Sequence, residues 1–232
     1  MQRYSIIHDK LPREVVLLKS YPCLYGKCSF CNYIEDNSTS LREIEATNFE
    51  VLDQITAQYG VLEVLNSGSV FELPDSILSA IKQIADAKKI HTIYFETYYG
   101  YRKRLAEIHN YFPNQQIRFR IGIETFDDEF RARVLNKPFP TNDIQELAQQ
   151  FHACCLLICV TGQTREQITT DIKLALDNFN VITLNIFVNN GTSVKRDDKL
   201  VKWFTQEIYP TLKDNPKIEI LIDNKDLGVF VQ

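Results

Sequence analysis

Three cysteines lie within nine residues near the start of the chain: Cys23, Cys28 and Cys31, spaced C-x4-C-x2-C. Three thiolates this close together form a soft ligand set, suited to zinc or to an iron–sulfur cluster. Structural zinc prefers four protein ligands, and no fourth cysteine or histidine follows nearby. Plant-type [2Fe–2S] ferredoxins share the spacing but add a distant fourth cysteine. The pattern favours a [4Fe–4S] cluster with one open iron, with zinc and the ferredoxin centre as alternatives.

The other three cysteines, Cys154, Cys155 and Cys159, belong to the apolar run 153–160, where we expect them to pack in the core. The first ten residues, MQRYSIIHDK, lack the apolar stretch of a signal peptide. Such uneven cysteine spacing is not typical of a secreted disulfide scaffold. The sequence therefore predicts a reducing, cytoplasmic compartment.

The composition is that of an ordinary globular domain, with 232 residues, 44% of them hydrophobic and 24% charged. This length suits one domain, and we expect a single domain over 1–232. The apolar run 153–160 is far shorter than the about 20 residues that span a bilayer, so no membrane association is expected. The net charge of −4 argues against nucleic-acid binding as the main activity.

Apolar runs alternate with amphipathic stretches along the sequence, which predicts strands and helices in turn. Strands are expected at 14–20, 61–67, 91–97, 117–124, 154–161, 181–188 and 217–222. Helices are expected near 47–59, 75–88, 102–112, 127–136, 141–151, 165–178 and 198–212. This order implies a parallel sheet flanked by helices. About six such units, with no GxGxxG after the first strand, favour an α/β fold of the partial (β/α)6 TIM-barrel type over a dinucleotide-binding fold.

Polar residues alternate with apolar ones inside three of the predicted strands, so each of these strands has one polar face. The residues of these faces are Thr92, Tyr94, Glu96, Arg118, Arg120, Gly122, Glu124, Thr183, Asn185 and Asn189. A closed barrel fills its interior with branched apolar side chains instead. The alternation therefore predicts a polar interior that could hold a ligand, with a solvent-facing sheet edge as the alternative.

The segment YPCLYGKCSFCNY resembles the cluster loop of radical S-adenosylmethionine (SAM) enzymes. Phe30 occupies the aromatic place before the last cysteine, whereas the gap between the first two cysteines is one residue longer than usual in that superfamily. The stretch Asn66-Ser67-Gly68 resembles the strand end that receives the SAM amino group. Later strand ends, at Glu96-Thr97, Ile121–Thr125 and Val160–Thr164, agree in order. The resemblance covers roughly residues 13–225.

This resemblance implies that Cys23, Cys28 and Cys31 hold a [4Fe–4S] cluster whose open iron binds SAM. An external flavodoxin- or ferredoxin-type donor would supply one electron, and SAM cleavage would give a 5′-deoxyadenosyl radical. Glutamate could accept from the ribose hydroxyls, and Arg131 or Arg120 could pair with the methionyl carboxylate. The residues implied to bind SAM are Phe30, Asn66, Ser67, Gly68, Glu96, Glu124, Arg131 and Val160.

A closer similarity is to the radical SAM lyases that cleave a C–N bond on 7-deazaguanines, the queuine lyases and the lyase of archaeosine biosynthesis. It rests on the ending Cys28-x2-Cys31-x-Tyr33 and on the order Glu124…Arg131…Lys137. With no second cysteine cluster or RNA-binding module, the implied substrate is a small molecule, queuine. Another small molecule, a tRNA base, or a non-catalytic iron–sulfur or zinc protein are the alternatives.

Polar groups that could contact a guanine-like substrate are Arg120, Asn185, Glu219 and Asp223. The one basic stretch, YYGYRKR at 98–104, is interpreted as solvated surface, with an anion or nucleic-acid contact as the alternative.

Overall fold

The computed structural model describes residues 2–223 and 225–230, which form strands and helices in alternation. The chain divides into two compact units. The first comprises Met1–Gly26, Tyr33–Arg120 and Leu227–Gln232, and the second comprises Lys27–Asn32 and Ile121–Asp226. The cysteine loop and strand β5 (Gln116–Glu124) both run from the first unit into the second.

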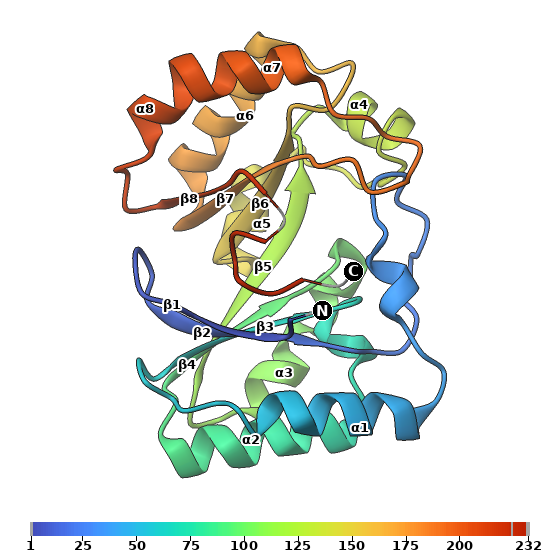
Figure 1. The fold of residues 1–232 in the computed structure, drawn as a ribbon, viewed down its shortest axis with the longest axis vertical. Helices are drawn as coiled ribbons and strands as arrows, with labels where there is room; N and C mark the ends of the chain where they lie inside the picture. Colours follow the sequence, from blue (N-terminus) through green and yellow to red (C-terminus); the bar gives the residue numbers. More distant parts are fainter. Residues whose placement is uncertain (1, 224, 231–232) are drawn as a thin grey trace. The chain divides into compact units, whose positions relative to one another are not determined.

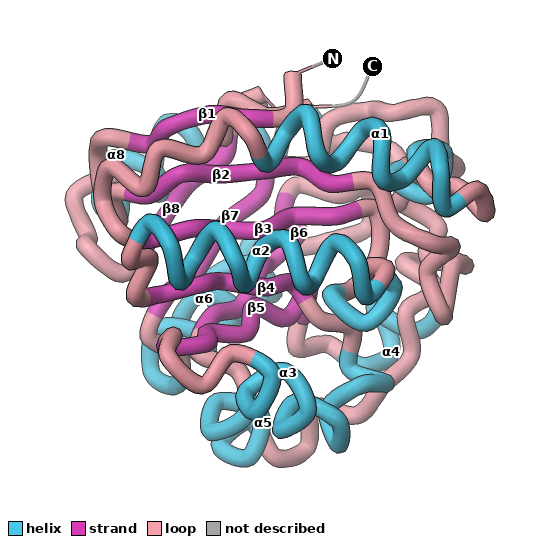
Figure 2. Tube along the Cα trace, turned by 90° about the horizontal axis from the view of Figure 1, so that it is seen from below, coloured by secondary structure: helices cyan, strands magenta, loops and turns pink. Residues whose placement is uncertain are grey.

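The first unit is a sheet covered by helices on one face (Figures 1 and 2). Its strands, in spatial order, are β1 (Tyr4–Ile7), β2 (Arg13–Leu18), β3 (Val61–Asn66), β4 (Thr92–Glu96) and the start of β5. All neighbours are parallel except β1 and β2. Its helices are α1 (Leu41–Leu52), α2 (Asp75–Lys88) and α3 (Leu105–Tyr111), with 3-10 turns η1 (Tyr33–Asp36), η2 (Val70–Glu72) and η3 (Tyr99–Arg104).

The second unit contains the end of β5 and three parallel strands, β6 (Ala153–Ile158), β7 (Val181–Ile186) and β8 (Ile218–Leu221). Its helices are α4 (Asp128–Arg133), α5 (Ile144–Gln150), α6 (Arg165–Asn178), α7 (Asp198–Trp203), the π-helical turn η4 (Phe204–Ile208) and α8 (Tyr209–Leu212). Helix α6 packs against β6 (Figure 1). No helix among the described residues is both long and apolar enough to cross a lipid bilayer.

The seven predicted strands are confirmed as β2 to β8, and the helices predicted at 75–88 and 165–178 have the predicted bounds. Strand β1 was missed, because its four half-buried residues are too few for a recognisable alternation. The helix predicted at 47–59 is wrong: α1 begins after Ser40, whose side chain accepts from the amide of Glu43. Ser40-x-x-Glu43 has the same capping pattern as Thr47-x-x-Glu50, which lies inside α1 and starts no helix.

The helix predicted at 198–212 is interrupted by the π-helical turn η4. Pro210 stands at the start of α8 and has no amide hydrogen, so a regular α-helical ladder cannot continue through it. Asn189 lies beyond the end of β7 and not on its polar face, and its side chain accepts from the amide of Arg196 at 3.0 Å.

The strand register confirms the other polar faces. In the first unit, Glu63 is paired with Tyr94, and Tyr94 with Arg118, while Glu96 is paired with Arg120. In the second unit, Cys155 is paired with Thr183 and Thr183 with Glu219, while Leu157 is paired with Asn185. Paired residues of neighbouring strands point to the same side of a sheet, so one face in the first unit is largely polar. The corresponding face in the second unit carries Thr183, Asn185 and Glu219 among apolar residues.

A buried ion cluster occupies the polar face of the first unit. Glu63, Arg13 and Arg120 are each less than 5% exposed. Arg120 Nη2 lies 2.8 Å from Glu63 Oε1, and Arg13 Nε donates to Glu63 Oε2. Burial acts to raise the pKa of Glu63, but the charges of Arg120 and Arg13 outweigh it and hold that pKa at about 2. The guanidinium of Arg120 is therefore engaged inside the unit.

We expect Glu63→Gln to lower the free energy of unfolding by about 3–5 kcal/mol, because two buried guanidiniums lose their common counter-charge. Urea denaturation followed by circular dichroism measures this change. The control is Glu107→Gln, which removes one partner of an exposed ion pair with Arg104 in the same unit. A loss no larger than that of the control would contradict the structural role of the cluster.

Asp171 on α6 connects this helix to the end of β5 in the second unit. It is 3% exposed, and its Oδ1 accepts from the amide of Phe126 at 2.9 Å. Its Oδ2 has no hydrogen-bond partner among the described residues. Burial raises the pKa of Asp171 to about 6, against the hydrogen bonds from Thr125 and Phe126 that lower it.

The pKa of Asp171 is higher in the folded protein than in the unfolded one, so its protonation stabilises the fold. This contribution is complete below about pH 4 and is lost as the pH rises through about 6. Relative to Asp171→Asn, the wild type should therefore lose up to about 3 kcal/mol of stability between about pH 4 and pH 7. Urea titrations of both proteins across this range test it, and parallel pH profiles would contradict it.

Candidate active site

In the first unit, predicted site residues lie where β3 and β4 end. Asn66 is 5% exposed, and its Nδ2 donates to the carbonyl of Ser69 at 3.0 Å. The Oδ1 of Asn66 and the Oγ1 of Thr97 are buried and have no hydrogen-bond partner among the described residues. Buried polar atoms are almost always paired, so two such atoms at neighbouring strand ends indicate a site for a bound polar group.

The turn after β3 depends on a glycine and on a buried carboxylate. A Cβ atom at Gly68 would lie 2.9 Å from Glu72 Oε2, so any larger residue at this position would displace the carboxylate from its place. Glu72 accepts from the amides of Ser69 and Leu24 and from the hydroxyl of Tyr101. It thereby connects the turn, the cysteine loop and η3. Sequence analysis missed Glu72, although Ser69-x-x-Glu72 is a capping-box pattern that could have indicated it.

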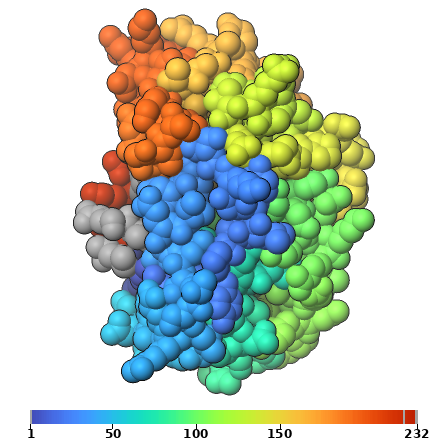
Figure 3. Space-filling model, turned by 90° about the vertical axis from the view of Figure 1, so that its right-hand side faces the viewer, coloured from blue at the N-terminus to red at the C-terminus, as the bar shows by residue number. Residues whose placement is uncertain are grey.

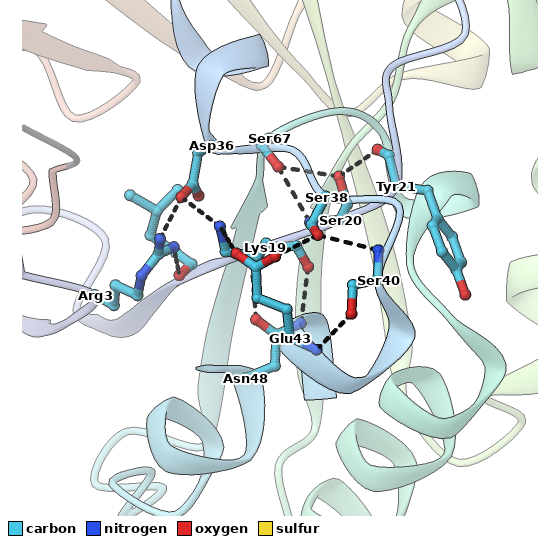
Figure 4. A network of polar contacts seen from close by, with 11 residues as sticks. Arg3, Lys19, Ser20, Tyr21, Asp36, Ser38, Ser40, Glu43, Asn48 and Ser67 are labelled. Carbon is cyan, nitrogen blue, oxygen red and sulfur yellow. Dashed lines mark hydrogen bonds and ion pairs between the residues drawn. The ribbon is translucent and has the colours of Figure 1, made fainter. Parts of the chain in front are cut away.

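The two ends of the cysteine loop are fixed by a polar network in the first unit (Figure 4). The amide of Ser38 donates to the carbonyl of Ser20, and the amide of Ser20 donates to Ser67 Oγ at 3.1 Å. Asp36 is buried and pairs with Arg3 at 2.5 Å and with Lys19 at 3.4 Å. Ser67, predicted to bind SAM, thus holds the end of β2 in place.

In the second unit, the segment 27–32 carries Cys28 and Cys31 and is held by side chains and backbone from distant parts of the sequence. The amide of Ser29 donates to the carbonyl of Leu135, and Asn136 Nδ2 donates to the carbonyl of Lys27 at 2.7 Å. Asn190 Nδ2 donates to the carbonyl of Phe30 at 2.8 Å. The ring of Phe30 packs against a buried cluster formed by Leu135, Leu157, Val160, Phe187 and Val194.

Lys137 is the second site residue that sequence analysis left without a role. Its Nζ donates to Glu124 Oε1 at 2.6 Å and to the carbonyl of Gly122 at 2.7 Å, and it lies 5.8 Å from the ring centre of Phe30. Burial acts to lower the pKa of Lys137, but the negative charges of Glu124 and Cys28 raise it above the usual value. A charged ammonium group is therefore stable in this buried place.

The backbone is strained where the second unit presents these groups. Glu124, Asn136 and Cys159 have φ values of 67°, 47° and 63°, in the left-handed region that non-glycine residues rarely adopt. Glu124 ends β5, and Cys159 follows the last residue of β6. Such strain clusters at functional sites, which supports a site at these strand ends.

Arg131 is fully buried, and its guanidinium is used within the second unit. It donates to the carbonyls of Thr125 and Phe139, pairs with Asp128 and lies 4.2 Å from the ring centre of Phe139. These contacts favour a structural role over the implied contact with the SAM carboxylate. Val160 lies in the buried cluster next to Phe30, with its amide donating to Gln163.

Of the four residues predicted to contact substrate, two share one face of the sheet in the second unit. Asn185 and Glu219 share the polar face of the second unit, and Asn185 Oδ1 is buried with no hydrogen-bond partner among the described residues. Asp223 is exposed in the turn after β8, where it accepts from the amide of Lys225. Arg120 belongs to the first unit and is paired with Glu63.

The six cysteines fall into two kinds. Cys23, Cys28 and Cys31 are partly exposed, and Cys154 and Cys159 are buried, as predicted for core residues. The prediction is wrong for Cys155, which is partly exposed because it lies on the same face of the sheet as its partner Thr183. No group of three cysteine, histidine or acidic side chains within 2–223 and 225–230 is gathered as a metal site. The assignment of the cluster ligands therefore rests on the spacing of the cysteines and on their soft donor atoms.

The protein is similar to known proteins of solved structure. No protein-family model matches the sequence, and no curated protein matches it. A solved structure of a queuine lyase from Clostridium spiroforme, bound to SAM and queuine, is 47% identical, with a TM-score of 0.96 over 100% of both chains. Two further structures resemble the protein in fold alone. One is SuiB of Streptococcus suis bound to the precursor peptide SuiA, with 19% identity and a TM-score of 0.53 over 93% of this chain and 49% of that one. The other is methylornithine synthase (PylB), with 15% identity and a TM-score of 0.59 over 89% of this chain and 64% of that one.

The full-length match at 47% identity defines the protein as a radical SAM enzyme, a class that uses a [4Fe–4S] cluster and SAM. It confirms the predicted fold class, the α/β radical SAM core of the partial (β/α)6 type. Within this class, the chain belongs to the queuine lyase family. The alternatives of a zinc protein and of a plant-type ferredoxin are thereby set aside.

We expect Lys137→Met to weaken SAM binding by at least about tenfold, or ~1.4 kcal/mol, because Glu124 loses the cation that orients its carboxylate. Anaerobic calorimetry of the reconstituted protein with SAM measures the affinity. The control is Lys195→Met in the same unit, since the ammonium group of Lys195 is exposed and donates to the carbonyl of Thr192. Unchanged SAM affinity in a folded Lys137→Met protein would show that this ammonium has no part in the site.

Proposed function

We propose that this protein cleaves the C–N bond in the 7-substituent of queuine, as a step in queuosine salvage. The observation that carries the proposal is the full-length match, at 47% identity, to a queuine lyase bound to SAM and queuine. The resemblance of its motifs to those of the 7-deazaguanine lyases implies the same substrate. A small-molecule substrate is also consistent with the net charge of −4.

When bound, the cluster and SAM supply a 5′-deoxyadenosyl radical, for which an external one-electron donor of the flavodoxin or ferredoxin type is needed. We assign Cys23, Cys28 and Cys31 as the cluster ligands. Thiolates bind iron, and the backbone near these cysteines is held at Ser20, whose amide donates to Ser67 Oγ, and at Lys27, whose carbonyl accepts from Asn136. The protein's part is to fix these thiolates and to exclude competing hydrogen donors.

Two carboxylate or amide oxygens are suited to hold SAM. The buried Oδ1 of Asn66 can accept from the SAM ammonium, because it has no hydrogen-bond partner among the described residues. Glu124 is held by Lys137 with one carboxylate oxygen, which leaves the other to accept from ribose hydroxyls. Ser67 and Gly68 shape the turn beside Asn66, and Phe30, Glu96 and Val160 remain proposed contacts. We propose Lys137, in place of Arg131, as the cation for the methionyl carboxylate.

A guanine-like edge presents N–H donors, which oxygen acceptors on the polar face of the second unit could bind. Asn185 is the strongest candidate, because its Oδ1 is buried and has no partner among the described residues. Glu219 lies on the same face, and its Oε2 is 3.4 Å from Thr183 Oγ1. Arg120 is engaged in an ion pair with Glu63, and Asp223 is exposed, so neither is favoured as a substrate contact.

The remaining predictions belong to this proposal. We propose one radical SAM domain over 1–232, supported by a match that covers the whole of both proteins. We further propose a reducing, cytoplasmic location, in which the cysteines stay reduced, and no nucleic-acid partner.

The test is an anaerobic assay of the protein reconstituted with iron and sulfide. With SAM and dithionite, 5′-deoxyadenosine should rise several-fold on adding queuine, and the freed 7-deazaguanine product should appear with it. Cys28→Ala should lose the cluster iron and all 5′-deoxyadenosine. Its matched control, Cys154→Ala, removes a buried cysteine outside the loop and should keep both.

Mass spectrometry of the products decides between the alternatives. If 5′-deoxyadenosine forms at the same rate with and without queuine, the substrate is a different one. Retention of the cluster iron by Cys28→Ala would contradict the ligand assignment.

A further inference from the structure

Within the first unit, the cysteine loop packs against the basic stretch 98–104. The ring of Tyr25 stacks on that of Tyr98, with centroids 5.4 Å apart and planes 24° from parallel. A Cβ atom at Gly100 would lie 3.7 Å from Leu24 Cδ2. Leu24 follows Cys23 directly and is 62% exposed, so an apolar side chain projects into solvent beside the first cysteine. Figure 3 shows the blue N-terminal segment beside the green segment around residue 100.

Three cations follow Gly100 in the same basic stretch. Arg102 lies over the ring of Tyr99, 4.2 Å from its centre, and Lys103 is exposed. Arg104 lies over the ring of Phe71 and pairs with Glu107, an acidic partner on α3. The protein as a whole has a net charge of −4, so a local excess of positive charge stands out against a negative background.

We propose that Leu24, Tyr25, Tyr98, Arg102 and Lys103 form a docking surface for the acidic one-electron donor that reduces the cluster. The inference rests on the proposed function, because that function needs an electron from outside the protein. An electron should enter close to the cysteines, and this surface includes the residue after Cys23. An exposed apolar centre with a charged rim is the usual anatomy of a protein interface. The cations would steer a negatively charged partner toward it.

Aromatic rings among cations can also bind single-stranded RNA, by stacking on its bases. The contacts here argue against that use. Arg102 covers a face of Tyr99, Arg104 covers a face of Phe71, and Tyr25 and Tyr98 stack on each other. Because these ring faces are covered by neighbouring side chains, the bases of a nucleic acid have little room to stack on them. The surface is better suited to a protein partner that is acidic and partly apolar.

The experiment compares two reductants on the reconstituted enzyme. The variants are Lys103→Glu and the double variant Arg102→Glu/Lys103→Glu. The control is Lys89→Glu, since Lys89 is exposed and lies before the start of β4, whereas Arg102 and Lys103 lie after its end. Stopped-flow bleaching of the cluster absorbance, without queuine, measures reduction by an acidic flavodoxin and, separately, by dithionite. Each rate is measured at low and at high ionic strength.

We expect the double variant to be reduced by flavodoxin at least about tenfold more slowly than the wild type at low ionic strength, with a smaller difference at high salt. Lys103→Glu should fall between the two, and Lys89→Glu should match the wild type. Reduction by dithionite should be the same in all four proteins, because a small inorganic ion needs no docking surface.

Equal flavodoxin rates in wild type and double variant would overturn the inference, and so would equal slowing with dithionite. Filter binding of bulk tRNA tests whether the surface binds RNA instead. If the wild type binds tRNA, the double variant does not, and the flavodoxin rates of the two are equal, the inference is overturned in favour of RNA. Since reduction is measured without queuine, a failure of queuine cleavage leaves this result intact. The two proposals can therefore fail separately.

Discussion

The cysteine loop has almost no regular secondary structure of its own, so its shape depends on hydrogen bonds that other segments make to it. Glu72 accepts from the amide of Leu24, Asn136 donates to the carbonyl of Lys27, and Asn190 donates to the carbonyl of Phe30. A buried or half-buried backbone group without such a partner would destabilise the loop. These hydrogen bonds therefore hold the backbone of the cysteine loop, and with it the cluster ligands, in place within each unit.

Buried charge is the second constraint, and each unit meets it with partners of its own. In the first unit, two guanidiniums enclose Glu63; in the second, Lys137 lies against Glu124. Desolvated ions are stable only when they are paired and hydrogen-bonded. Such pairs hold polar side chains in one orientation on faces that would otherwise be filled with branched apolar residues. The polar faces are thus compatible with a folded core.

Much of the fold follows from the sequence, because alternation within strands and capping residues at helix starts are local properties. The strands at Val61–Asn66 and Val181–Ile186 and the helix capped by Thr164 begin where their patterns indicate. Errors occurred where two patterns competed, as with Ser40 and Thr47, or where a single proline altered the hydrogen bonding of a long helix, as at Pro210. Strand β1 is too short to have a pattern.

The site was only partly predictable, because a sequence shows the chemical type of a side chain but not its partner. Arg120 and Arg131 have the guanidinium that suits a carboxylate, yet each is engaged by groups of its own unit. Lys137 was placed in a motif without a role, and only its position between Glu124 and Phe30 gives it one. Asn66 and Asn185 were given roles from the sequence, and their buried oxygens, which have no partner among the described residues, support those roles. A buried acceptor without a donor indicates a bound ligand. The spacing of residues in the sequence cannot show such an acceptor, because its state depends on which side chains surround it in the fold.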